Sequence, residues 1–175
     1  MPVQLTEAWI AIEDFLSAGG PVLYWIGVTL FALWMLILER FWYLRTGHPQ
    51  EVKRVVDEWT ARPETRSWHA AQIRRGLIAD VRENLSKSLG TIATLVAVCP
   101  LLGLLGTVSG MVEVFDIMAA TGSSSARAMA SGVTKATIPT MAGMVAAISG
   151  IYPSASLLAK ARSETQRVSD LLVQR

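Results

Sequence analysis

The sequence contains a single cysteine and only two histidines in 175 residues. Cys99 therefore has no intramolecular disulfide partner, and no cluster of metal-ligating residues surrounds it. His48 and His69 have no nucleophile or metal-spaced partner nearby, and the glycines of 103–110 lie in an apolar run without the lysine of a phosphate-binding loop. We predict no catalytic residues, no metal, no cofactor and no nucleic-acid partner, so nothing supports an enzyme.

Charge is absent from three long apolar segments: Pro21–Leu38, about Leu89–Val112, and the stretch that follows Lys135 and ends at Ala159. A transmembrane helix needs about 20 mostly apolar residues, because the hydrocarbon core is roughly 30 Å thick and each residue rises about 1.5 Å. One such segment could be a buried helix of a soluble protein. Three of them in 175 residues indicate an integral membrane protein in a lipid bilayer.

Lysine and arginine are also absent from residues 1–38. The segment 39–88, in contrast, is rich in them: Arg40, Arg45, Lys53, Arg54, Arg62, Arg66, Arg74, Arg75, Arg82 and Lys87. The turn between the second and third segments contains only Arg127, whereas the tail 160–175 is again basic. Basic loops remain in the cytoplasm, so we predict a periplasmic N-terminus and a cytoplasmic C-terminus.

The first 20 residues do not resemble a cleaved signal peptide, because they open with polar and acidic residues and lack a basic region. Their apolar residues recur instead at helical spacing: Leu5, Ala8, Trp9, Ile12 and Leu16. This pattern predicts a short amphipathic helix on the outer membrane surface.

The cytoplasmic segment is predicted to be helical. We expect His48-Pro49 to break the first helix, and a short helix with an apolar face to follow and end at Arg62-Pro63. From Ser67 onward apolar residues recur every four positions: Ile73, Leu77, Val81, Leu85 and Leu89. This repeat runs into the second apolar segment, so it predicts one continuous helix from about Ser67 to about Met118.

The predicted fold is an all-α membrane protein with three transmembrane helices, the second extended into the cytoplasm as a long helix, plus a short N-terminal amphipathic helix. The predicted segments are a periplasmic amphipathic helix (1–20), the first transmembrane helix (21–38), a cytoplasmic helical region (39–88), the second transmembrane helix (89–118), a periplasmic turn with the start of the third helix (119–134), the third transmembrane helix (135–159) and a cytoplasmic tail (160–175).

Small residues distinguish the second and third membrane segments from the bulky first one. The second places Gly103, Gly106, Thr107 and Gly110 on one face, and the third places Thr140, Gly143, Ala147 and Gly150 near one face. Small residues let membrane helices approach closely. One interpretation is a packing surface whose threonines bond their own helix. The joint pattern favours a bundle around a central space, where the hydroxyls bond a polar group inside.

The middle of each membrane segment contains no carboxylate. Glu113 and Asp116 lie near the outer end of the second segment, and Lys135 near the outer start of the third. Glu113 and Lys135 either pair across the hairpin or simply occupy the interface. Buried ionisable groups usually mark proton paths in membranes, so a path here requires a carboxylate from another chain.

The stretch Cys99–Met111, together with Thr140–Ile148, resembles the MotA/TolQ/ExbB proton-channel family, most closely its ExbB members. The run Pro-Leu-Leu-Gly-Leu-Leu-Gly-Thr-Val from Pro100 carries the resemblance most specifically. The resemblance implies a homopentamer in the bacterial inner membrane whose second and third helices line a pore. Thr107 and Thr140 would then face the protonatable Asp of an ExbD-like single-span partner.

The resemblance further implies coupling of the proton-motive force to a TonB-like protein and to outer-membrane uptake of iron complexes and vitamin B12. At one position this sequence departs from the pattern: many ExbB proteins have a Glu where Lys135 stands. That difference puts a carboxylate role at this site in doubt. Two alternatives stay open, a TolQ-like subunit of the Tol envelope system and a membrane scaffold that conducts nothing.

Overall fold

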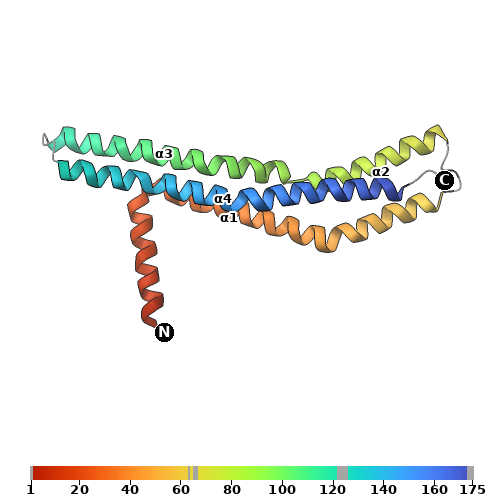
Figure 1. Ribbon diagram of the computed structural model, residues 1–175, viewed down its shortest axis with the longest axis horizontal. Helices are drawn as coiled ribbons and strands as arrows, with labels where there is room; N and C mark the ends of the chain where they lie inside the picture. Colours follow the sequence, from red (N-terminus) through yellow and green to blue (C-terminus); the bar gives the residue numbers. More distant parts are fainter. Residues whose placement is uncertain (1, 63, 65–66, 122–125, 173–175) are drawn as a thin grey trace. The chain divides into compact units, whose positions relative to one another are not determined.

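The computed structural model describes residues 2–62, 64, 67–121 and 126–172 (Figure 1). They form the helices α1 (Pro2–Thr60), α2 (Trp68–Ser86), α3 (Leu89–Thr121) and α4 (Ala126–Leu171). Three stretches of these residues are long and apolar enough to cross a membrane: Gly19–Thr60, Trp68–Ala120 and Gly132–Leu171. The predicted all-α fold with three membrane-spanning helices is therefore confirmed. Most of the predicted polar turn after α3 lies outside the described residues.

The chain divides into two compact units. The first comprises Met1–Leu33 and Thr94–Gly150, and the second comprises Trp34–Ala93 and Ile151–Arg175. The first unit therefore holds the start of α1 with most of α3 and the first half of α4. The second holds the rest of α1, all of α2 and the end of α4. Each unit is built from helices distant in sequence, so its interior depends on long-range contacts.

The beginning of α1 is set apart from the rest of the helix at Gly20. This residue has φ 66° and ψ −167°, a backbone conformation that glycine adopts readily and other residues do not. The helix changes direction there, and its early part leaves at a steep angle (Figure 1). A helix is thus present before Gly20, while its predicted amphipathic placement on a membrane surface stays a prediction.

The expected break at His48-Pro49 is wrong, because α1 remains helical to Thr60. A proline inside a helix removes one backbone hydrogen bond and crowds the carbonyl four residues earlier, at a cost of about 3 kcal/mol. The backbone nevertheless stays helical through this residue. Burial of Val55 and Trp59 after the proline favours the helix and offsets this cost.

The first unit buries aliphatic residues of α1 against small residues of α3 and α4, and the aromatic residues described there are exposed. Its buried cluster consists of Val22, Leu23, Ile26, Cys99, Ala146 and Ala147. Bulky residues point outward, with Trp25 64% exposed and Phe31 74% exposed. Exposed apolar side chains of this size suit lipid or further protein chains, because water would penalise them.

The second unit also has an apolar core, which includes aliphatic residues and one tryptophan. Its buried apolar residues are Ile37, Val55, Trp59, Ala70, Val81, Leu85, Leu89, Ile92, Leu157, Ala161, Val168 and Leu172. Three members of the predicted four-residue repeat, Val81, Leu85 and Leu89, are among them. That repeat therefore marks the face that α2 buries.

The predicted helix over 67–118 is interrupted, so the expectation of an unbroken helix is wrong at one point. α2 ends at Ser86, Lys87 has ψ 135°, and Ser88 has φ 65°, which is a left-handed backbone conformation. α3 then begins at Leu89. Tertiary contacts at this break, described below, compete with the helical pattern of the sequence.

Candidate functional site

The candidate site is the face that joins α3 to α4 in the first unit. The contacts run antiparallel: Gly103 lies against Thr140, and Gly110 lies against Ala136. At each of these glycines a Cβ atom would approach the facing residue to 2.9 Å, closer than real side chains pack. The two helices therefore meet backbone to backbone, which only small residues permit.

Two further glycines of this face make still closer approaches than Gly103 and Gly110. A Cβ on Gly143 would lie 2.5 Å from the carbonyl oxygen of Cys99, and a Cβ on Gly106 would overlap the ring of Pro139. Gly150 leaves room for Leu33 of α1. The glycines singled out in the sequence thus lie where helices of this unit touch.

Thr140 links the two helices by a hydrogen bond. Its hydroxyl donates to the carbonyl oxygen of Gly103 at 2.9 Å. The preceding residue, Pro139, is fully buried and has no backbone N–H to donate. Because the Thr140 hydroxyl donates to α3, it does not bond its own helix. The interpretation that the membrane threonines bond their own helices is thus wrong for Thr140.

Thr107 does bond its own helix. Its hydroxyl donates to the carbonyl oxygen of Leu104 at 2.7 Å, and its side chain is partly exposed. It lies one turn beyond Gly103, the residue that Thr140 contacts. A hydroxyl has two acceptor lone pairs in addition to its proton, so both threonines can still accept a hydrogen bond.

Glu113 and Lys135 are both exposed, and no ion pair joins them. Gly110, three residues before Glu113, lies against Ala136, the residue after Lys135. The pairing across the hairpin is therefore not formed, and a position of the two residues at the membrane interface stays a prediction. Among the described residues no group of histidine, cysteine or carboxylate side chains could hold a metal ion.

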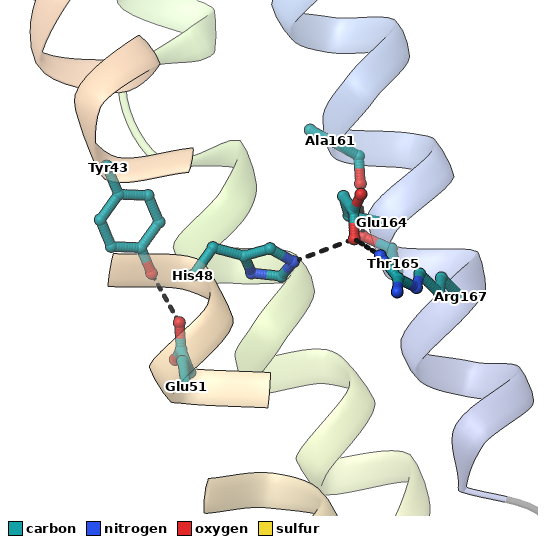
Figure 2. Close-up of polar contacts among 7 residues, drawn as sticks. All are labelled: Tyr43, His48, Glu51, Ala161, Glu164, Thr165 and Arg167. Atoms are coloured by element: carbon teal, nitrogen blue, oxygen red, sulfur yellow. Dashed lines mark hydrogen bonds and ion pairs between the residues drawn. The ribbon is translucent and has the colours of Figure 1, made fainter. Parts of the chain in front are cut away.

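The structure also reveals polar contacts in the second unit that sequence reasoning missed. His48 is 4% exposed and its Nε2 lies 3.4 Å from the Glu164 carboxylate, which also pairs with Arg167 at 3.6 Å (Figure 2). Nearby, the Tyr43 hydroxyl donates to Glu51 at 2.5 Å (Figure 2). His48 and Glu164 are 116 positions apart, so no local pattern could have predicted their contact.

The chain has three helices able to span a bilayer. Two of them, α3 and α4, pack closely through glycines and a threonine. These features define a multi-pass membrane protein whose helices pack through small residues. A profile of the MotA/TolQ/ExbB proton channel family matches residues 45–170. The chain belongs to this family. The match covers both α3 and α4, so the candidate site lies within it.

One relative is an ExbB-like biopolymer transport protein, named ExbB-like 1, from Synechocystis sp. (strain PCC 6803). It is 41% identical to this chain over 109 residues, which is 60% of this chain and 36% of the relative. The chain thus aligns with about a third of that protein's length.

Proposed function

We propose that this chain is an ExbB-like proton-channel subunit of an inner-membrane motor that couples the proton-motive force to TonB-dependent transport across the outer membrane. Iron–siderophore complexes and vitamin B12 are the proposed cargo. Membership of the proton-channel family and likeness to an ExbB-like protein support this proposal. The basic residues of segment 39–88 and of the tail support a periplasmic N-terminus and a cytoplasmic C-terminus.

The observation that carries the proposal is a pair of threonine hydroxyls, on α3 and α4, in the part of the membrane segments that lacks carboxylate side chains. Thr140 and Thr107 lie within apolar helices whose middle contains no carboxylate. We infer a homopentamer in which α3 and α4 of each copy surround the single-span helix of an ExbD-like partner. That partner supplies the protonatable Asp, and a TonB-like protein receives the movement.

The threonines suit both protonation states of such an Asp. A protonated carboxyl group would donate a hydrogen bond to a threonine oxygen, and an ionised one would accept from the hydroxyl after it rotates. No charge on this chain would then hold the partner in one place. The partner helix could move between equivalent threonines of neighbouring copies as its Asp titrates.

The first prediction concerns these two hydroxyls. Thr107→Val and Thr140→Val should each abolish energised siderophore uptake in cells lacking any other copy, while the purified complex keeps its subunits. A membrane hydrogen bond contributes only about 0.6 kcal/mol on average, so its loss alone should not dissociate the assembly. Thr137→Val is the matched control, because Thr137 makes a similar bond within its helix at 2.8 Å. Normal uptake in both test variants would remove the hydroxyls from the mechanism.

Two alternatives are separated by the same set of variants and by genome context. In a non-conducting scaffold, Gly106→Leu should force α3 away from α4, because Gly106 faces Pro139 of the same chain without space, and so break the oligomer. The threonine variants should then have no effect. In a TolQ-like subunit, the threonine variants should impair envelope integrity rather than uptake. A neighbouring gene for a single-span chain with one intramembrane Asp supports a channel, and an adjacent TonB-like gene supports the ExbB-like role.

A further inference from the structure

The side chain of Arg40 is buried, with 5% exposure, just beyond the first apolar segment. An arginine stays charged at any physiological pH, so a buried one requires partners. Its Nη1 donates to the carbonyl oxygen of Asn84 at 3.1 Å, and its Nη2 donates to the hydroxyl of Ser88 at 3.2 Å. The Glu39 carboxylate is farther, at 3.9 Å. The guanidinium is therefore held mainly by the break between α2 and α3.

The carbonyl that Arg40 binds normally has another partner. In a continuous α-helix the oxygen of Asn84 would accept the backbone N–H of Ser88, four residues later. Here the chain turns away at Lys87, whose N–H donates to Glu83, and on the other side of the break Ile92 donates to the carbonyl oxygen of Ser88. Arg40 thus replaces the backbone donor that a straight helix would use.

The break is strained where the two helices join. Ser88 is the only residue other than glycine with positive φ among the described residues. Serine lacks the freedom of glycine in this region, because its Cβ approaches the backbone closely. The apolar repeat runs across the break, with Leu85 and Leu89 both buried. Local preference therefore favours a straight helix, and a tertiary contact opposes it.

We propose that Arg40 is a latch that holds α2 and α3 apart at Ser88, and that the chain has a second conformation in which this helix is continuous. In the second conformation the Asn84 oxygen bonds to the Ser88 N–H, and Arg40 is released. The latch joins the inner end of the first membrane segment to the direction of α2. This inference concerns the chain's own geometry and does not rest on the proposed function.

Spin labels on either side of the break test the latch. Ala79→Cys and Ala93→Cys, both at exposed positions, are introduced into the full chain with Cys99→Ala, which removes the only native cysteine. In a continuous helix these positions are about 21 Å apart along the axis, from about 1.5 Å per residue. Distances are measured by double electron–electron resonance in lipid.

Arg40→Gln should move the main population from the wild-type separation toward that of the continuous helix. Arg45→Gln is the matched control, because Arg45 is an exposed arginine on the same helix whose guanidinium contacts the Phe41 ring instead. It should leave the distribution unchanged. Identical distributions for wild type and Arg40→Gln would overturn the proposal.

Two variants of Ser88 test the same idea, and the first of them does not depend on the folding of Arg40→Gln. Ser88→Val should straighten the helix with Arg40 present, because a β-branched residue resists positive φ. Adding Ser88→Gly to Arg40→Gln should restore the broken distribution, because glycine adopts this conformation freely. Failure of Ser88→Val to shift the distribution, or of the glycine to restore it, would show that Arg40 does not act through the break.

Discussion

At the scale of single residues, the close packing of α3 against α4 depends on glycines, which have no side chain. Gly103, Gly106 and Gly143 let the two backbones approach until carbonyl oxygens and a threonine hydroxyl are within reach of each other. A larger residue at any of them would separate the helices and remove the Thr140 bond. The polar and the small residues of this face therefore act together, because the glycines bring the Thr140 hydroxyl within reach of α3.

The second prediction follows at this scale. Gly143→Ala should destabilise the folded chain by about 1–3 kcal/mol, the usual cost of overpacking, because its Cβ would meet a backbone oxygen that cannot turn aside. Gly27→Ala is the control, since a Cβ there meets nothing within 4 Å. Thermal unfolding in detergent measures both. Equal melting temperatures for the two variants would contradict the close contact.

At the scale of elements, helix ends are held by arginines from other helices. Arg40 binds the last turn of α2, and Arg74 binds the last turn of α4. The final carbonyls of a helix have no partner within it, so a cation that bonds them also favours the negative end of the helix dipole. In the second unit these arginines fix how helices from distant parts of the chain pack.

The third prediction concerns the end of α4. Arg74 donates to the Leu172 oxygen at 2.5 Å and to the Ser169 oxygen at 2.8 Å. Arg74→Gln should loosen the last turn of α4 and raise amide hydrogen exchange there by about fivefold to tenfold, the equivalent of about 1–1.4 kcal/mol. Arg75→Gln, at the exposed neighbouring position, should change nothing. Unchanged exchange in Arg74→Gln would mean that apolar packing alone holds the end.

At the scale of the whole molecule, the chain has a wide apolar surface and no acid in the middle of its membrane segments. Both features favour assembly with other chains. In the proposed assembly, copies of the same chain would cover the apolar faces of α3 and α4, and a different chain would supply the missing carboxylate. Such an assembly would bury apolar surface that the single chain leaves exposed.

The fourth prediction tests this division. The purified chain alone, reconstituted in liposomes, should not conduct protons, because a path through the bilayer needs an ionisable group that it lacks. Adding the proposed ExbD-like single-span partner should permit conduction, measured with a pH-sensitive dye. The same partner with Asp→Asn is the control and should conduct nothing. Proton flux through the chain alone would refute the need for a second chain.

The sequence alone predicted the all-α class, the three spanning segments and the small-residue faces, because the length of an apolar run and the spacing of glycines are local properties. It did not predict that Thr140 bonds α3 while Thr107 bonds its own helix, since the same hydroxyl serves either partner. It was wrong at His48-Pro49 and at Ser88, where a local preference for a break or for a helix was overruled. Only the tertiary structure decided those points, because the burial of Val55 and Trp59 and the contacts of Arg40 depend on residues far away in the chain.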